Sequence, residues 1–391
     1  MRLKKRVLCL FALIVAFLFL INCGSDTYHR TDDPDDPNAA GLLSLADPET
    51  SPDDDSASPG LQVEKLEELF DEMGFEKYLD IRPVRQRPAL NGYTRYFYST
   101  DDMKCYDGSA MSVAVSEGDS NNVMFFMEGG GASWPGYYFS YAIDILFDIS
   151  FKSRWPNNPL KDWNFVYVPY CDNSIHAGDS ETIELDREVY HHGLRHTAAA
   201  AALMKELFPN PDKVLITGVS AGGFGTYMAW PIVKSLYMDT DTYVLSDSGV
   251  GFWNPEKPVT WETIQQGWNL RIPSACEKCN GPVQTWLYEL YMEYDPQVRI
   301  GLFTAYRDFI ISRMFLQMSG VDFESMLMDI TDQIKAEYPD RFGRFFIDGY
   351  THTTYEFILP EGPRYQVDGV SLFEWIDMMV NDYPQWNDRL E

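Results

Sequence analysis

Short apolar runs alternate with longer stretches of helical pattern through most of this chain. Each run ends in residues such as glycine, aspartate, cysteine or serine. The runs occupy residues 122–131, 164–171, 213–220, 242–249, 299–308 and 344–352. Helical periodicity marks stretches between them, such as residues 186–208 and 326–338. This alternation predicts an α/β fold: a mostly parallel central sheet with helices on both faces. Because no linker-like break interrupts it, we expect one domain over residues 61–391.

The beginning of this domain has a different pattern. Residues 61–75 have a helical period, and residues 91–99 and 109–118 are rich in β-branched and aromatic side chains. We expect a helix followed by an antiparallel pair of strands.

Residues 1–23 have the layout of an export signal, with basic residues before the apolar stretch 7–21. That stretch is short for the ~20 residues of a membrane-spanning helix, which is the alternative. It ends in LINC, which resembles the lipobox of bacterial lipoproteins except for Asn22. On that resemblance Cys23 carries lipid and becomes the mature N-terminus, so that the protein stays in the cell envelope; plain secretion is the alternative. Residues 24–60 are rich in Asp, Pro and Ser, which predicts a disordered tether.

The net charge of −28 argues against nucleic acid or an anionic membrane surface as a partner, because both require clustered Lys and Arg. We therefore expect contact with a membrane only through a lipid on Cys23.

Of the six cysteines, Cys105, Cys171, Cys276 and Cys279 lie in the expected domain. An even number in an exported chain predicts disulfides. Cys276 and Cys279 could bridge each other, which would leave Cys105 with Cys171; sequence alone does not decide the connectivity. A zinc site would need a second close pair of Cys or His, so disulfides are favoured over a metal.

The stretch GVSAGG places Ser220 between a strand pattern ending at Thr217 and a helix pattern. A G-x-S-x-G motif in this context is typical of a nucleophile elbow, in which a tight turn exposes a serine above a helix N-terminus. The alternative is a plain glycine-rich turn with serine as filler.

An elbow serine needs an acid and then a histidine later in the chain. Of the six histidines only His352 follows Ser220, just past an apolar run. Asp308 ends another run and is the favoured acid, because the triad acid follows an earlier strand. Asp247 and Asp348 are the alternatives.

Glycines 129–131 directly follow a strand pattern. A glycine loop in this position is typical of the oxyanion loop of lipases and esterases. We expect the backbone N–H groups of Gly130 and Gly131 to converge with that of Ala221 on an ester carbonyl oxygen. The aromatic residues that follow, Trp134 among them, are expected in the core or a pocket wall.

His192 and His196 stand four apart in a helical stretch, which suggests a metal pair. Neither a zincin glutamate nor a third ligand is evident, so we expect core or capping roles and no metal or organic cofactor.

Several segments together resemble the pectin acetylesterase family, which includes the animal carboxylesterase Notum. They lie in family order between about residues 90 and 360. The segments are KCYDGSA, FFMEGGGASW, VPYCDNSIHAGD, GVSAGGFG, TAYRDF and FFIDGYTHTTY.

The resemblance implies an α/β-hydrolase fold with Ser220 as nucleophile, Asp308 as acid and His352 as base. It implies the same oxyanion donors and supports a Cys105–Cys171 bridge. The sequence lacks the family's cysteines after the glycine loop, where Ala132 and Ser133 stand, and beside His352. These departures bear on the pocket rim and the substrate.

The expected activity is hydrolysis of carboxylic esters, with acetyl esters of polysaccharide as the family's best-known use. Longer acyl esters are the alternative within the family. A non-catalytic lipoprotein that binds carbohydrate or a partner is the alternative outside it.

Overall fold

The computed structural model of the protein describes residues 59–89, 92–140, 157–184, 186–251, 254, 256–279, 285–354 and 365–391. The predicted signal, Cys23 and nearly all of the tether lie outside these residues. Helix α2 (Pro59–Met73) begins two residues before the expected start of the domain, inside the segment interpreted as tether.

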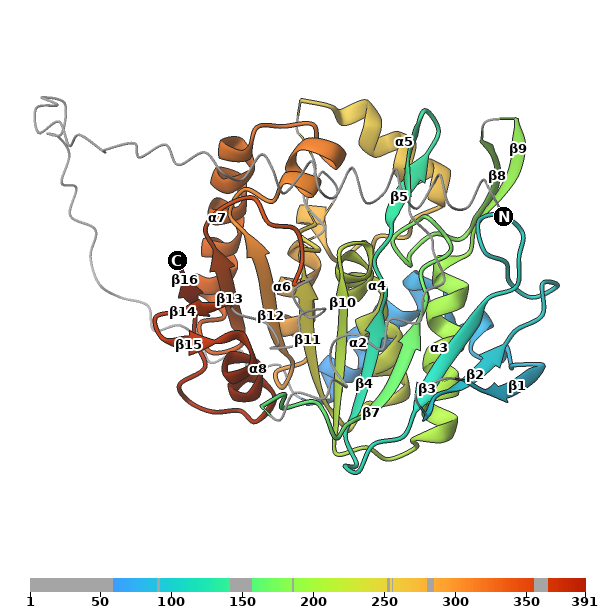
Figure 1. Ribbon diagram of the computed structural model, residues 1–391, viewed down its shortest axis with the longest axis horizontal. Helices are drawn as coiled ribbons and strands as arrows, with labels where there is room; N and C mark the ends of the chain where they lie inside the picture. Colours follow the sequence, from blue (N-terminus) through green and yellow to red (C-terminus); the bar gives the residue numbers. More distant parts are fainter. Residues whose placement is uncertain are drawn as a thin grey trace, which may run out of the picture. The chain divides into compact units, whose positions relative to one another are not determined.

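A ten-stranded sheet forms the centre of this part of the chain (Figure 1). Neighbouring strands from β7 to β16 run parallel, whereas β1, β2, β3 and β7 pair antiparallel. In spatial order the strands are β1 (Arg85–Pro88), β2 (Thr94–Phe97), β3 (Ser112–Ser116), β7 (Asn164–Val168), β4 (Val123–Met127), β10 (Lys213–Val219), β11 (Asp241–Asp247), β12 (Arg299–Ala305), β13 (Phe342–Ile347) and β16 (Arg389–Leu390). The prediction of a mostly parallel α/β sheet is confirmed, and so is the antiparallel pair, as β2 and β3.

Helices cover both faces of this sheet. Besides α2 they are α3 (Gly193–Leu207), α4 (Ala221–Leu236), α5 (Pro258–Trp268), α6 (Trp286–Tyr294), α7 (Gly320–Glu337), α8 (Leu372–Val380), the single-turn helices η1 (Glu76–Tyr78) and η3 (Glu277–Cys279), and the π-helix η4 (Ile310–Phe315). Alternate residues of β4 face opposite cores: Phe125 packs in the cluster that includes α3 and α4, and Met124 and Phe126 in the cluster that includes α8. Because both faces are covered, the central strands are buried throughout, which explains why they read as continuous apolar runs.

Two hairpins stand beside the sheet: β5 (Gly131–Trp134) with β6 (Tyr137–Ser140), and β8 (Ser180–Glu184) with β9 (Arg187–His191). A third, short pair joins β14 (Gln366–Val367) to β15 (Val370–Ser371).

The helix expected over residues 186–208 was wrong in its first third. Residues 187–191 form strand β9, and α3 begins only at Gly193. Val189 pairs with Thr182 of β8 in the hairpin, a non-local contact that outweighs the local helical pattern.

The structure contains two disulfides, Cys105–Cys171 and Cys276–Cys279. Within the described residues, none of the helices is long and apolar enough to cross a membrane.

Candidate active site

Ser220 lies on a sharp turn between β10 and α4. Its backbone has φ 54° and ψ −118°, a region that non-glycine residues rarely adopt. The flanking glycines are sterically required, because a Cβ at Gly222 would lie 2.0 Å from the carbonyl oxygen of Met127, and one at Gly218 would lie 2.4 Å from that of Gly222. The turn therefore has the geometry of a nucleophile elbow, in which local strain keeps the serine hydroxyl at the end of the strand.

His352 connects Ser220 to Asp308. Its Nε2 lies 2.9 Å from Ser220 Oγ, and its Nδ1 lies 2.8 Å from Asp308 Oδ2. When Nδ1–H donates to the carboxylate, the Nε2 lone pair is directed at the serine hydroxyl, as a general base requires. The structure thus brings together three residues that are far apart in the sequence.

Asp308 is fully buried in the turn between β12 and η4. Its second oxygen, Oδ1, accepts a hydrogen bond from the backbone N–H of Ile311, 3.0 Å away. Both carboxylate oxygens therefore have a donor, and the orientation of the side chain is set by the loop.

The predicted oxyanion donors lie on the β4–β5 loop and at the start of α4. Ala221 is the first residue of α4, where N–H groups have no acceptor within the helix. Gly131 has φ +90°, which a residue with a side chain rarely adopts. Gly131, Ala221 and Ser220 line one cavity, whereas Gly130 packs under Tyr170, so that a Cβ there would lie 2.3 Å from the ring.

This cavity has a volume of about 60 Å³ and opens beside the Ser220 hydroxyl. Its wall is almost entirely aromatic or aliphatic. Besides the residues named above it is lined by Ala132, Trp134, Ile175, Phe224, Trp261, Ile264, Trp268, Leu270, Ile311, Phe315 and Leu316. Trp134 was expected in the core or a pocket wall and lies in the wall of this cavity, whereas the lining side chains of α5 and η4 were not predicted. In the sequence these side chains appear only as clustered apolar residues, a pattern that a buried core would also produce.

Comparisons with known proteins show which family this chain resembles. The family described as "PAE: Pectinacetylesterase" matches residues 147–282. The chain is 25% identical over 185 residues to Pectin acetylesterase 11 of Arabidopsis thaliana, which covers 43% of this chain and 47% of that protein. It is 22% identical over 229 residues to Palmitoleoyl-protein carboxylesterase NOTUM of Schmidtea mediterranea, which covers 49% of this chain and 43% of that protein. The chain is similar to members of the pectin acetylesterase and Notum family. It spans less than half the length of these two curated relatives.

A solved structure of the Wnt deacylase Notum from Drosophila superposes with a TM-score of 0.54 at 16% identity, over 80% of this chain and 95% of that one. At this identity the similarity shows the fold alone, which is the α/β-hydrolase fold expected for the family.

The two alternative acids, Asp247 and Asp348, have other partners in the structure. Asp247 is buried, and its Oδ2 accepts hydrogen bonds from both the backbone N–H and the hydroxyl of Thr354. Burial raises the pKa of Asp247 to about 6, although the bonds from Thr354 lower it. Asp348 is exposed and lies 3.4 Å from Arg307. Neither of them replaces Asp308 at His352 Nδ1.

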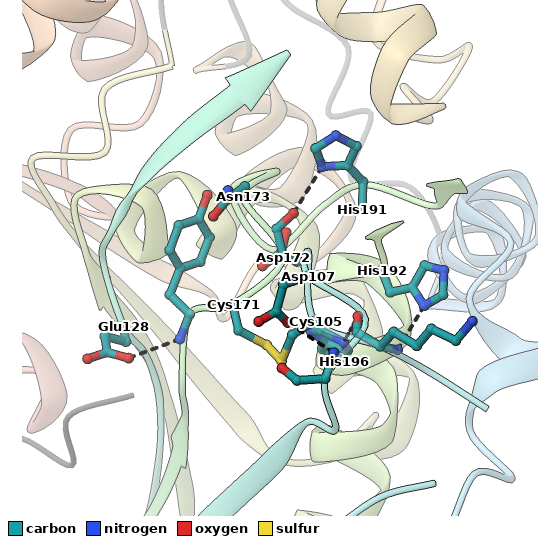
Figure 2. Close-up of a disulfide and its surroundings, with 12 residues drawn as sticks. Cys105, Asp107, Glu128, Cys171, Asp172, Asn173, His191, His192 and His196 are labelled. Atoms are coloured by element: carbon teal, nitrogen blue, oxygen red, sulfur yellow. Dashed lines mark hydrogen bonds between the residues drawn. A yellow bond between two sulfur atoms is a disulfide. The ribbon is translucent and has the colours of Figure 1, made fainter. Parts of the chain in front are cut away.

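The four remaining histidines of the domain are buried. Figure 2 shows three of them, His191, His192 and His196, around the Cys105–Cys171 disulfide. His192 directly precedes α3 but makes no side-chain capping bond; its Nδ1 accepts from the N–H of Lys104, and its Nε2 lies 3.0 Å from Glu181. His196 Nε2 donates to the carbonyl oxygen of Lys104. Burial lowers the pKa of His192 to about 4 and that of His196 to about 3, so both rings are neutral near pH 7. Among the described residues, no three His, Cys, Asp or Glu side chains gather as a metal site.

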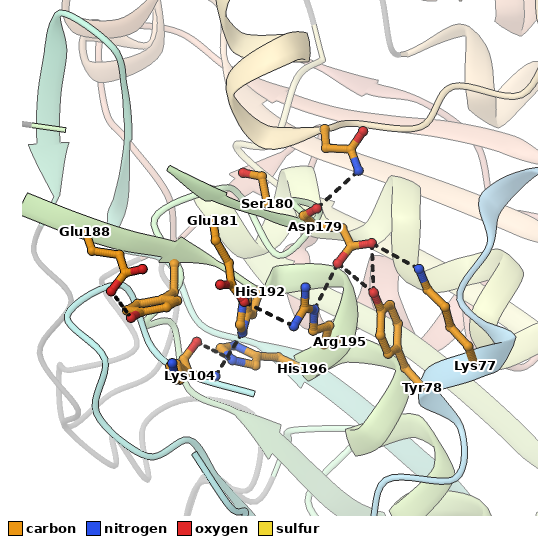
Figure 3. A network of polar contacts seen from close by, with 12 residues as sticks. Lys77, Tyr78, Lys104, Asp179, Ser180, Glu181, Glu188, His192, Arg195 and His196 are labelled. Atoms are coloured by element: carbon orange, nitrogen blue, oxygen red, sulfur yellow. Dashed lines mark hydrogen bonds and ion pairs between the residues drawn. The ribbon is translucent and has the colours of Figure 1, made fainter. Parts of the chain in front are cut away.

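A polar network around Asp179 lies beside His192 and His196 (Figure 3). Asp179 accepts hydrogen bonds from Tyr78 of η1 and Arg195 of α3, and its backbone N–H donates to the carbonyl oxygen of Trp268. Trp268 ends α5 and lines the cavity. The network therefore fixes one wall of the cavity to the body of the domain.

Proposed function

We propose that this protein is a serine carboxylesterase. The single observation that carries the proposal is the continuous contact of Asp308, His352 and Ser220 on a strained elbow beside a cavity. His352 Nε2 takes the proton from Ser220 Oγ as the oxygen attacks the carbonyl carbon of the ester. Asp308 keeps the imidazole in the correct tautomer and stabilises its charged form.

The tetrahedral intermediate carries a negative oxygen, which the N–H groups of Ala221, Gly131 and Gly130 bind. Gly131 and Ala221 line the cavity with Ser220 and are the two main donors in this proposal. The intermediate collapses, and the alcohol leaves with the proton from His352. Water, deprotonated by His352, then attacks the acyl-enzyme; the carboxylic acid is released and Ser220 regains its proton.

The acyl group enters the apolar cavity in this proposal. A cavity needs only ~10–15 Å³ to hold a water molecule, so a cavity of about 60 Å³ exceeds what the methyl of an acetyl group fills. Burying each further methylene contributes ~0.8 kcal/mol. We therefore favour an acyl chain of several carbons over the acetyl group expected from the sequence. The Notum relatives are named as palmitoleoyl-protein carboxylesterases and the plant relatives as pectin acetylesterases, so the family contains both chain lengths.

A series of p-nitrophenyl esters tests the activity and the chain length together. The purified protein should hydrolyse the butyrate and octanoate with a higher kcat/KM than the acetate, and Ser220→Ala should abolish all three activities. An acetate preference would restore the polysaccharide acetylesterase interpretation. No hydrolysis of any ester would leave the alternative of a non-catalytic binding protein.

Export, with lipid on Cys23, remains part of the proposal. The two disulfides support an oxidising compartment. Labelled palmitate should migrate with the protein when it is expressed with its N-terminal segment, and Cys23→Ala should release it from the membrane fraction. Unchanged membrane association would remove the lipid anchor from the proposal.

A further inference from the structure

The candidate oxyanion loop lies against a second loop, residues 169–176, which follows β7. Tyr170 takes part in three hydrogen bonds. Two of them join the two loops, and the third lies within the second loop. The backbone N–H of Tyr170 donates to Glu128 Oε2 (3.0 Å), its hydroxyl donates to the carbonyl oxygen of Gly131 (2.7 Å), and the same hydroxyl accepts from the N–H of Ile175 (3.0 Å). The ring covers Gly130, where a side chain would collide with it. Tyr170 therefore contacts the candidate oxyanion loop at Glu128, Gly130 and Gly131.

His176, at the other end of the second loop, also contacts the candidate oxyanion loop. Its Nε2 donates to the carbonyl oxygen of Glu128, 2.8 Å away, and the residue also packs against Gly225 of α4. Burial lowers the pKa of His176, so the ring is neutral and its one proton lies on the nitrogen that faces the carbonyl. The hydrogen bond from His176 to Glu128 therefore does not change with pH near neutrality.

The second loop is itself held in a strained conformation. Asn173, Ile175 and His176 have φ values of 57°, 52° and 60°. Non-glycine residues keep such angles only where the surroundings determine them. Here the Cys105–Cys171 disulfide anchors the start of the loop, Asp172 accepts from the N–H of Ser174 (2.9 Å), and the carbonyl oxygen of Asn173 accepts from Ser133 of β5 (2.9 Å). Figure 2 shows the disulfide with Glu128, Asp172 and Asn173 around it.

We infer that Tyr170 and His176 are positioning residues that hold the backbone of residues 128–131 where it can bind the oxyanion. The inference rests on the proposed esterase activity. Oxyanion donors act because they are placed before the charge develops, so a loop that shifts or fluctuates loses part of their effect. A disulfide-anchored loop with several directional bonds supplies that rigidity to a glycine sequence that has little of its own.

Tyr170→Phe is the main test, because it removes only the hydroxyl and keeps the ring over Gly130. We expect kcat to fall about tenfold, less than the ~10²–10³-fold loss from a missing donor, with KM changed less than about twofold. Tyr237→Phe is the matched control. Tyr237 is also buried and donates to a backbone carbonyl, that of Phe208, but it caps the far end of α4. Tyr237→Phe should lose comparable stability and keep its kcat.

His176 allows a rescue experiment. His176→Met removes the donor to Glu128 and should lower kcat, whereas His176→Gln retains an N–H near the position of Nε2 and should recover most of it. Equal losses in the two variants would mean that the bond to Glu128 is unimportant for catalysis, and would overturn the role of His176.

Hydrogen exchange separates this inference from the proposed function. The amides of residues 129–131 should exchange faster in Tyr170→Phe than in the unmodified protein or in Tyr237→Phe. If the unmodified protein hydrolyses no ester, the proposed function fails while exchange still decides whether Tyr170 orders the loop. If the unmodified protein is active and Tyr170→Phe matches it in kcat, or if Tyr237→Phe loses as much kcat, the positioning role is wrong.

Discussion

Thr354 donates two hydrogen bonds to the buried carboxylate of Asp247, one from its backbone N–H (3.0 Å) and one from its hydroxyl. The neighbouring Thr353 donates its N–H to Ser248 Oγ, 2.9 Å away. The end of β11 thus anchors the loop that carries His352, while Asp308 contacts the imidazole itself. Two buried aspartates near one histidine therefore have different expected roles.

Asn substitutions distinguish the two carboxylates. Asp308→Asn should lower kcat about 10⁴-fold with little loss of stability, because the amide no longer selects the correct tautomer of His352. Asp247→Asn should lower kcat less than about tenfold and reduce the free energy of unfolding by ~1–3 kcal/mol, through weaker bonds to Thr354. Ester hydrolysis and denaturant unfolding measure both effects. The opposite ranking of the two kcat values would make Asp247 the acid.

The strained backbone at Ser220 should lower the stability of the protein, although the serine is needed for activity. Ser220→Ala and Ser220→Gly should both lose esterase activity. Ser220→Gly should be about 1–3 kcal/mol more stable than Ser220→Ala, because only glycine adopts φ 54° without strain. Denaturant titration of the two inactive variants gives the difference directly, and equal stability would argue against a strained elbow.

The cavity predicts that chain-length preference depends on α5. Ile264 lines the cavity from α5, a helix that carries none of the triad residues, so Ile264→Trp should shorten the space for an acyl chain. The kcat/KM for p-nitrophenyl octanoate should fall at least tenfold, while that for the acetate should change less than about threefold. A parallel loss for both esters would indicate general damage to the site instead.

The two disulfides should contribute unequally to stability. Cys105 and Cys171 are 66 residues apart, and Cys276 and Cys279 are three apart. From loop-closure entropy, losing the first bridge costs about 4 kcal/mol and losing the second about 2 kcal/mol. Paired Cys→Ser variants of each bridge, compared by denaturant unfolding, should show that order, and the reverse order would contradict the entropic account.

The buried histidines predict a loss of stability in acid. The pKa of His196 is about 3 in the folded protein, below the ~6.5 of an unfolded histidine, so the unfolded chain binds more protons between these values. This contribution is therefore fully present above pH ~6.5 and is lost as the pH falls toward 3. His196→Gln should flatten the fall in unfolding free energy between pH 7 and pH 4.5, whereas an unchanged slope would contradict the buried neutral ring.

Local sequence patterns predicted much of the fold. The buried strands appear as apolar runs because helices cover both sides of the sheet, and the elbow has its strand, glycines and helix within one short segment. The order of Ser220, Asp308 and His352 along the chain sufficed to propose them as a triad. Hairpins β5–β6 and β8–β9 were not predicted, because each forms through pairing between two strands that local periodicity does not reveal.

The types and order of the reactive side chains could be predicted from local motifs, because a catalytic motif requires particular residues at particular turns. Other features come from the packing of distant segments. Asp308 rather than Asp247 contacts His352, and Gly131 lines the cavity while Gly130 lies under Tyr170. The side chains of α5 and η4 form an apolar wall beside Ser220. Each of these depends on contacts between segments far apart in the chain. Apolar residues in a local pattern look the same whether they face a closed core or an open cavity, and packing alone separates the two.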